Sequence, residues 1–396
     1  MHAKRIIQDL LHKKCPTMHA KRRHCVAKLV EAGRRGGLGL LKMSRVLGSE
    51  TALRHRIKCC DRLLSNRHLN DERHQVYRAM NECVLSRQGR IGIIIDWSDL
   101  LADGSGHLLR AAAIVKGRAF IVYEEVHTGK DYGKLDVHRE FLKNLRIVLP
   151  ADCQPVLVTD AGFRATWFNL ASELQYEWVG RIRNRDNVCA QGSSEWVGCK
   201  TLYSRATARP QSLGWFTYTQ SNRTQCRLTV IKKRPQGRHR KTAFGKNSRS
   251  AKSKKSRSAQ VEPWLLAVSP ALADLSAKNV VALYAGRMQI EQTFRDVKNG
   301  QFGLGLTASQ TRKHQRLAIL LLLGALITYA LWLIGLTAAA CGYRIRYGSK
   351  KKAPTTLSTI SLAQSWLNER RQSFQSRRQL NEALHELASM VMRVGI

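Results

Sequence analysis

The long uncharged segment at residues 317–341 must be buried, either in a membrane or in the core of the protein. The segment LAILLLLGALITYALWLIGLTAAAC is 25 residues long and contains no charge. By length alone it is a candidate membrane-spanning helix. Basic residues flank it on both sides, so the flanks predict no orientation in a bilayer. Since it is the only such segment in a very basic chain, we expect instead a buried central helix with a break near Gly324 or Gly335.

The charge of the chain indicates its partner. There are 67 Lys and Arg against 28 Asp and Glu, which gives a formal net charge of +39 at pH 7. A compact state with this excess repels itself unless a polyanion is near. Nucleic acid is therefore the expected partner, and an anionic membrane surface is the second candidate. Twelve basic residues lie between Lys232 and Arg257, which predicts a loop that contacts phosphates without base specificity.

The first 88 residues are predicted to be helical and basic. The stretch SETALRHRIKCCDRLLSN at 49–66 has the pattern of an amphipathic helix, and it follows MSRVLG in the manner of a helix-turn-helix unit. Its basic side chains, which we expect to be exposed and to contact DNA, are Arg54, Arg56, Lys58 and Arg62. The alternative is a basic surface helix that does not recognise a specific DNA sequence.

The ten cysteines favour a reducing compartment. None forms a C-x-x-C pair, and no two pairs have zinc spacing. The N-terminus lacks the apolar core of a signal peptide. We therefore expect reduced thiols and a cytoplasmic location.

Two short apolar runs each end in an aspartate. RIGIIIDWSD closes its run at Asp96, and QPVLVTDAGF closes at Asp160. Such runs are typical of strands buried on both faces, and a charge at their end is costly unless it is paired or bound to a metal. Alternatively, Asp96 bonds a neighbouring turn while Asp99 competes for its role, and Asp160 caps the next helix. The order of predicted strands and helices indicates an α/β fold.

The segment YAGRMQIEQTFRDVKN at 284–299 holds a third carboxylate. Tyr284, Arg287, Glu291 and Lys298 are separated by offsets of three, seven and fourteen residues from the tyrosine. On one helix they share a strip about 60° wide, beside an apolar stripe. The simpler interpretation is a solvated helix with an Arg287–Glu291 pair.

Asp96, Asp160 and Glu291 are therefore candidate catalytic metal ligands. Three carboxylates brought together repel each other strongly without a cation, and hard oxygen donors favour Mg²⁺ or Mn²⁺. Two such ions about 4 Å apart activate a water or a 3′-hydroxyl and stabilise the leaving oxygen. The other three residues of the strip would then contact phosphates beside the metal.

Together these motifs resemble the cut-and-paste DDE transposases of bacterial insertion sequences, specifically the transposon-ten group with a Y-x2-R-x3-E-x6-K signature. The resemblance covers about residues 50–345 and is weaker at both ends. The motifs that carry it are DWSD at 96–99, VTDAGF at 158–163, EPWLLA at 262–267, RMQIEQTFRDVK at 287–298 and FGLGL at 302–306.

The resemblance implies the domain organisation. An RNase H-like α/β catalytic domain at 89–345 contains a β-rich insertion at about 190–275. A helical DNA-binding region at 1–88 precedes it. A helical C-terminal region at 346–396 follows, beginning with a linker at 348–354.

The resemblance also implies roles for individual residues. Asp96, Asp160 and Glu291 become the metal ligands. Trp264 stacks on a base that is flipped out of the element end. Met288 contacts the position in the DNA that this base has left. Taken alone, Trp264 is equally explained as a strand aromatic in the core, and Met288 as a core residue.

The function implied is excision of a mobile DNA segment and its joining to target DNA. The expected partners are transposon ends, target DNA and a second copy of the chain, with Mg²⁺ as cofactor, Mn²⁺ as substitute and no membrane. The expected location is the nucleoid in a bacterial cytoplasm. Three alternatives stay open: an RNase H-like nuclease or resolvase without joining activity, a non-catalytic basic DNA-binding protein, and a membrane protein built on 317–341.

Overall fold

The chain forms two compact units. The computed structural model describes residues 3–394 apart from 49, 87–88, 102, 184–185, 235–246, 249, 252, 254–260, 302, 348–356 and 370–375. Unit 1 comprises Met1–Gln154 and Met288–Arg393, and unit 2 comprises Pro155–Arg287 with Val394–Ile396. Most of the basic run at 232–257 and the linker at 348–354 lie outside the described residues.

Unit 1 holds most of the helices. Those before its first strand are α1 (Ala3–Lys14), α2 (Ala20–Gly36), α3 (Leu40–Val46), α4 (Leu53–Leu64), α5 (Arg67–Asp71) and α6 (Arg73–Leu85). Those after it are α7 (Leu135–Val148), α11 (Gln289–Lys298), α12 (His314–Ala340), α13 (Tyr343–Tyr347), α14 (Thr359–Glu369) and α15 (Arg377–Ser389). Two 3₁₀ turns, Gly129–Asp131 and Leu306–Ser309, complete the set in the described part of this unit.

The strands of unit 1 form an antiparallel meander. They are β1 (Gly89–Asp99), β2 (Gly106–Ala113) and β3 (Phe120–Thr128). β2 lies between β1 and β3 and pairs antiparallel with both. Asp96 lies directly across from Arg110, and Arg110 lies across from Glu124. Since cross-strand partners point to the same side of a sheet, these three charged side chains share one face.

Unit 2 is built on a mostly antiparallel sheet. Its strands are β4 (Cys153–Thr159), β5 (Glu177–Ile182), β6 (Asn187–Ala190), β7 (Trp196–Gly198), β8 (Gln211–Tyr218), β9 (Thr224–Ile231) and β10 (Trp264–Val268). The order is β4-β5-β10-β9-β8-β6-β7, and only β4 and β5 pair in parallel among these described strands. The chain therefore has the mixed α/β character that the sequence predicts.

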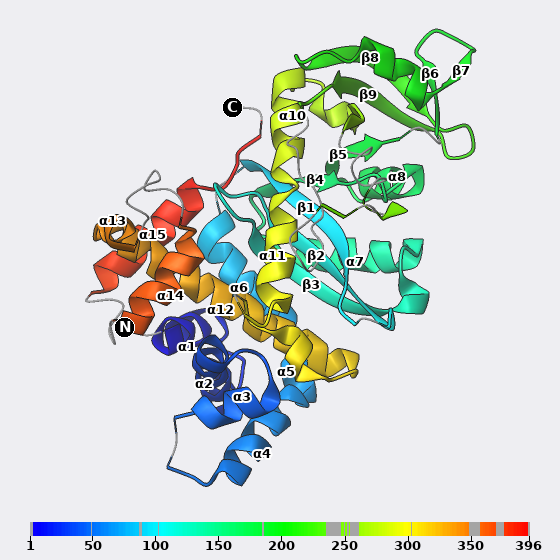
Figure 1. Cartoon of the computed structure of the whole chain (residues 1–396). Coiled ribbons are helices and arrows are strands. Elements are labelled where there is room, and N and C mark those ends of the chain that lie inside the picture. Colours follow the sequence, from blue (N-terminus) through cyan, green and yellow to red (C-terminus); the bar gives the residue numbers. More distant parts are fainter. Residues whose placement is uncertain are drawn as a thin grey trace. The chain divides into compact units, whose positions relative to one another are not determined.

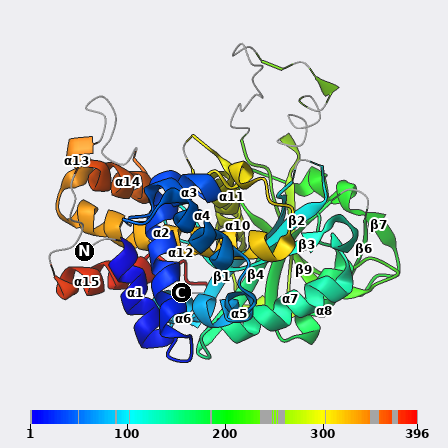
Figure 2. The same ribbon diagram turned by 90° about the horizontal axis from the view of Figure 1, so that it is seen from below.

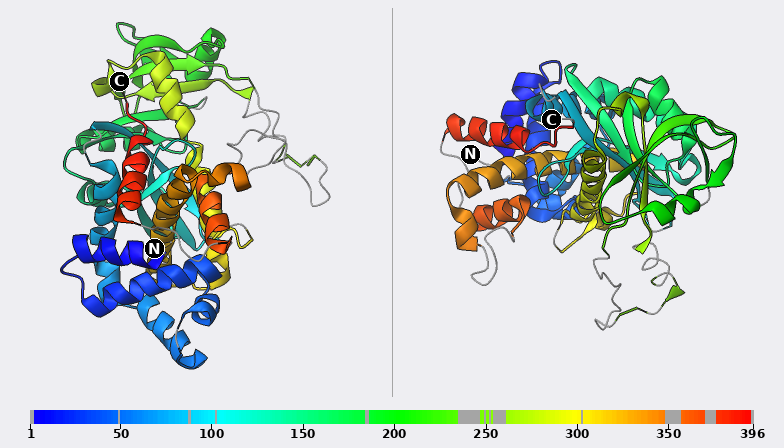
Figure 3. Two further views of the ribbon diagram at one scale, coloured as in Figure 1. Left: turned by 90° about the vertical axis from the view of Figure 1, so that its left-hand side faces the viewer. Right: turned by 90° about the horizontal axis from the view of Figure 1, so that it is seen from above.

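Helices cover both faces of the β5–β10 part of that sheet. On one face, Phe168 of α8 (Ala165–Glu173) stacks on Trp178 with ring centroids 4.3 Å apart. Gly180 lies on the same face, where a Cβ atom would collide with the Phe168 ring, so a side chain has no room there. On the other face, Tyr284 of α10 (Ala277–Gly286) packs against Trp264. The right-hand view of Figure 3 shows α10 against these green strands.

The uncharged segment forms α12, the central helix of unit 1. It is buried from Leu317 to Ala338, and it packs against α1, α2, α14, α15 and β3 (Figure 2). In the described part of the chain, α12 is the one helix long and apolar enough to cross a membrane, but protein surrounds it. The prediction of a buried helix is confirmed. The predicted break is wrong, because the helix continues through Gly324 and Gly335.

The two glycines of α12 differ in what surrounds them, and this difference is testable. A Cβ at Gly335 would collide with the Thr359 carbonyl oxygen of α14, whereas a Cβ at Gly324 would make ordinary contacts at 3.5 Å. Gly335→Ala should lower the free energy of unfolding by about 1–3 kcal/mol through overpacking. Gly324→Ala should raise it by up to about 1 kcal/mol, since alanine favours helix. Urea unfolding followed by circular dichroism measures both free energies. Equal changes in the two variants would contradict the close approach of α12 and α14.

Candidate active site

Helix α11 carries Glu291 and lies against β1 (Figure 1). The backbone N–H of Val115, beside the start of β1, donates to Gln289 Oε1 at 3.2 Å. At the other end, Lys298 Nζ donates to Ser98 Oγ at 2.7 Å and also to the Asp99 carbonyl. The first turn of α11 therefore lies near the start of β1 and its last turn near the end of β1, so the helix and the strand run in the same direction.

Asp96 lies on the strand face that α11 covers. Ser98, two residues further, points to the same face and contacts α11. Arg110, directly across from Asp96, donates from Nη1 to Thr293 Oγ1 at 2.7 Å. Asp96 therefore lies on the same strand face as these two neighbours, and its Oδ1 accepts from the Trp97 backbone N–H at 2.9 Å. Glu291 lies about 20° from Lys298 around the helix axis, and Glu291 and Ser98 line one hollow, so unit 1 brings Glu291 near the end of β1 that carries Asp96.

A hollow opens on the flank of α11 that carries Glu291. Its volume is about 460 Å³. The residues that line it are Ser98, Glu291, Phe294, Arg295, Lys298 and Asn299. Burial lowers the pKa of Lys298, the charge of Arg110 lowers it further, and Asp99 opposes both. The hollow therefore combines carboxylate and hydroxyl oxygens with two cations, a donor set suited to a metal ion and phosphate.

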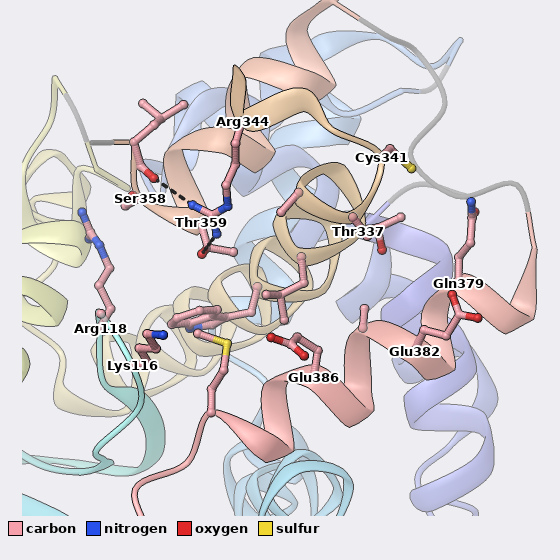
Figure 4. A pocket seen from close by; sticks show the side chains of 18 of the residues that line it. Lys116, Arg118, Thr337, Cys341, Arg344, Ser358, Thr359, Gln379, Glu382 and Glu386 are labelled. Carbon is pink, nitrogen blue, oxygen red and sulfur yellow. Dashed lines mark hydrogen bonds between the residues drawn. The ribbon is translucent and has the colours of Figure 1, made fainter. Parts of the chain in front are cut away.

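A larger cavity of about 1080 Å³ lies on the opposite flank of α11, where Gln292 lines it. Figure 4 shows Lys116 and Arg118 on one side and Glu382 and Glu386 on another. None of the predicted catalytic residues is among the described residues that line it. We therefore assign the candidate site to the smaller hollow.

The structure separates Asp96 from its competitor Asp99. The two are three residues apart on β1, so their side chains point to opposite faces. The Asp99 carboxylate lies 3.0 Å from His107 Nδ1 on the face away from α11.

Behind Asp96, a cluster of aromatic and histidine rings supports the strand end. Trp97 Nε1 donates to His138 Nε2 at 3.1 Å, and the His127 ring lies 5.5 Å from the Trp97 ring. Burial lowers the pKa of His138 to about 4, and the charge of His127 acts in the same direction. His138 is therefore neutral at pH 7 and accepts the tryptophan hydrogen bond.

This shift predicts a pH-dependent stability. The pKa of His138 is about 4 in the folded chain against 6.5 as its ordinary value, so the unfolded state binds more protons between these values. Stability is full above pH 6.5 and falls as the pH drops towards 4, by about 3 kcal/mol in total. His138→Gln keeps an acceptor for Trp97 but cannot be protonated, so it should flatten this part of the profile. Urea unfolding at pH 7 and pH 5 tests it, and parallel profiles would contradict the assignment.

In unit 2, Asp160 directly follows β4. Its Oδ1 accepts from the Gly162 backbone N–H at 2.8 Å, which forms a tight turn. The N-cap of α8 is Arg164, so the alternative in which Asp160 caps this helix is wrong.

The α10 face of unit 2 carries an aromatic pair. Trp264, the first residue of β10, meets Tyr284 edge to face at 4.9 Å. Lys233 Nζ lies 4.2 Å from the centre of the Trp264 ring. Trp264 is half-buried, and the Lys233 ammonium lies over its ring.

Tyr284 joins this pair to Asp160. Its side chain is buried, and burial raises its pKa. The cations Arg287 and Arg181 oppose that rise, while the Asp160 carboxylate adds to it. Tyr284, Arg287 and Asp160 therefore share one electrostatic neighbourhood in unit 2.

The sequence interpretation missed Glu262, although it lies in the EPWLLA motif. Glu262 Oε1 accepts from Tyr203 Oη at 2.7 Å, and its carboxylate also pairs with Arg183 and Arg181. Burial alone would raise its pKa, but these hydrogen bonds hold it below its usual range. Glu262 is the first acid after the basic run at 232–257, and this was the signal that could have identified this anchor of β10.

The segment 284–298 is not one helix. Helix α10 ends at Gly286 and α11 begins at Gln289, with the Arg287 N–H bonded to the Tyr284 carbonyl at 3.1 Å in a tighter turn. Tyr284 and Arg287 belong to unit 2, whereas Glu291 and Lys298 belong to unit 1. Met288, between the helices, is exposed, so its interpretation as a core residue is wrong.

Three of the four basic residues predicted on α4 are exposed as expected. Arg54, Lys58 and Arg62 are spaced by four residues and share a face of the helix. Arg56 is not exposed, because its guanidinium turns back to donate to the carbonyl oxygens of Arg45 and Leu47.

Comparison with known proteins identifies the family. A family model described as "Transposase DDE domain" matches residues 87–328, more than half of the chain. The chain belongs to the DDE transposase family. The DDE domain of this family is RNase H-like, in agreement with the predicted fold class. The transposase is also similar to the piggyBac transposase in a synaptic complex with hairpin DNA, with 12% identity, a TM-score of 0.37, and coverage of 96% of this chain and 80% of that one. No match is found among curated proteins.

DDE transposases generally use divalent metal ions. Within each unit, no group of three His, Cys, Asp or Glu among the described residues is placed to hold one. Of the predicted carboxylates, Asp96 and Glu291 belong to unit 1 and Asp160 belongs to unit 2. Their oxygens fit a hard divalent cation, and the hollow beside Glu291 has room for one.

Proposed function

We propose that this transposase cuts and joins DNA in a metal-dependent reaction, with Asp96, Asp160 and Glu291 as the ligands of Mg²⁺. The observation that supports the proposal is the hollow lined by Glu291 of α11 and by Ser98 of β1, two residues after Asp96, within the part of the chain that matches the DDE domain. Mn²⁺ has the same preference for oxygen and should substitute.

When bound, the metal ions would supply charge neutralisation at the scissile phosphate and a more acidic nucleophile. The chain's own residues have a different task, which is to hold the DNA. We assign Lys298, which donates to Ser98, the role of binding a phosphate beside the carboxylates. We assign Tyr284 and Arg287 a similar role in unit 2.

The proposed reaction proceeds through four in-line phosphoryl transfers. Water first nicks the element end, and the freed 3′-hydroxyl then attacks the opposite strand to give a hairpin. Water reopens the hairpin, and the 3′-end attacks target DNA. Each step needs an oriented nucleophile and a stabilised leaving oxygen, so one site can serve all four.

We further propose how the chain holds its DNA. The exposed α4 residues Arg54, Lys58 and Arg62 contact phosphates of the element end, and the half-buried Trp264 stacks an extruded base with Met288 probing its place. The proposed domains are 1–88 for DNA binding, 89–345 for catalysis and 346–396 at the C-terminus. We place the enzyme as a homodimer on two ends of an insertion sequence of the transposon-ten type, associated with the nucleoid of a bacterial cell.

A cleavage assay tests the proposal. Purified protein is incubated with labelled DNA that carries the terminal repeats found beside its coding region, in Mg²⁺ or in EDTA. Hairpin and joined products that require Mg²⁺ support the transposase. Nicking without joining indicates a nuclease, and a mobility shift without cleavage indicates a DNA-binding protein; either result overturns the proposal.

A further inference from the structure

We propose that a buried chain of four side chains, Tyr77–Glu124–Arg110–Thr293, positions Glu291 by fixing the rotation of α11. This inference rests on the proposed function, since Glu291 must be a metal ligand for its position to matter. The four residues are positioning residues: they act through α11 and touch neither substrate nor metal.

The contacts are continuous from α6 to α11. Tyr77 Oη donates to Glu124 Oε2 at 3.1 Å. Arg110 donates to the other oxygen of Glu124, Oε1, from Nε at 2.8 Å and from Nη2 at 2.5 Å. Its remaining Nη1 donates to Thr293 Oγ1 at 2.7 Å, and Thr293 in turn donates to the Ile290 carbonyl at 2.7 Å.

The chain is isolated from water. Arg110 is 0% exposed and Glu124 is 1% exposed. In a low-dielectric interior, charged hydrogen bonds are short and directional, and misaligning them is costly. The network therefore resists small displacements of Thr293.

Apolar packing alone would not hold α11 in this way. The buried face of the helix consists of Ile290, Thr293, Phe294 and Val297, and three of these are apolar. Apolar contacts have no preferred direction, whereas a hydrogen bond fixes both distance and angle. The Arg110 guanidinium also lies over the Phe294 ring, 4.7 Å from its centre. Arg110 thus holds the helix at two adjacent residues.

The rotation of α11 determines where the Glu291 carboxylate points. A carboxylate about 6 Å from a helix axis moves by about 1 Å for each 10° of rotation. Catalytic groups must be held within about 0.5 Å of their productive place. A loss of the Arg110–Thr293 hydrogen bond is therefore enough to misplace a metal ligand while the fold survives.

The test compares Thr293→Val with Thr293→Ser. Valine keeps the shape but removes the acceptor, whereas serine keeps the acceptor. In the metal-free protein, amide hydrogen exchange of residues 289–298 should be at least about 10-fold faster in Thr293→Val. Exchange in Thr293→Ser should stay within about 2-fold of wild type, and α7 should be unchanged in both. Equal exchange in the two variants overturns the inference, whatever the enzyme does.

The second measurement is the Mg²⁺ concentration that gives half the maximal cleavage rate. It should rise at least about 10-fold in Thr293→Val and remain near wild type in Thr293→Ser, with DNA-end binding unchanged. An unchanged value overturns the inference. If wild type shows no Mg²⁺-dependent cleavage, the proposed function fails instead, and the exchange comparison stands separately.

A milder variant covers the case in which Thr293→Val does not fold. Tyr77→Phe removes only the hydrogen bond at the far end of the chain. It should accelerate exchange in α11 by about 3-fold and raise the Mg²⁺ requirement in the same direction. Wild-type behaviour of Tyr77→Phe in both measurements overturns the inference.

Discussion

Asp96→Asn, Asp160→Asn and Glu291→Gln are each expected to lower the rate of Mg²⁺-dependent DNA cleavage by at least about 1000-fold, or about 4 kcal/mol of transition-state stabilisation. Each amide keeps the size of the carboxylate but removes one negative charge from the proposed metal site. Divalent cations need that charge for binding and orientation. Single-turnover cleavage of labelled element ends measures the rate, and a mobility shift should show that end binding is largely retained.

Asp99→Asn is the matched control. It lies in the same DWSD motif, but its carboxylate pairs with His107 on the opposite face of β1. It should cleave within about 10-fold of wild type, since it touches no proposed ligand. Normal cleavage by any one of the three test variants would remove that residue from the site.

The sequence predicted those features of the fold that depend on local pattern. Continuous apolar runs identified β1 and β4, because a buried strand needs no contact with distant residues to be recognised. Asp160 directly follows β4 as predicted, but Asp96 does not end β1, because pairing with β2 extends that strand to Asp99. Length and lack of charge likewise identified α12. The mistake at Gly324 and Gly335 arose because helix propensity was weighed without the neighbouring helix. Gly335 is a point of close approach to α14, and the continuous helix makes that approach possible.

Long-range contacts escaped the sequence interpretation. Arg110 and Glu124 are charged residues inside apolar strand runs, which was a signal that each needs a buried partner. Their pairing depends on the β2–β3 register, and the bond to Thr293 joins residues 183 positions apart. Arg56 shows the same limit, since helical periodicity places it on the surface while the carbonyl oxygens at the end of α3 draw it inward.

Glu124→Leu is expected to lower the free energy of unfolding by about 3–5 kcal/mol. The substitution leaves the Arg110 guanidinium buried without its counter-charge and leaves Tyr77 without its acceptor. An unpaired charge in the interior costs far more than the net contribution of the pair it belonged to. Urea unfolding at pH 7, followed by circular dichroism, measures the effect.

The double variant Arg110→Met/Glu124→Leu separates charge from packing. Because both charges leave together, it should recover most of the lost stability and lie within about 2 kcal/mol of wild type. Its α11 should nevertheless exchange amide hydrogens as fast as in Thr293→Val, since Thr293 has lost the same donor. A double variant that is stable and also holds α11 as firmly as wild type would show that the buried ion pair serves neither stability nor position. A Glu124→Leu variant within about 1 kcal/mol of wild type would show that water reaches Arg110.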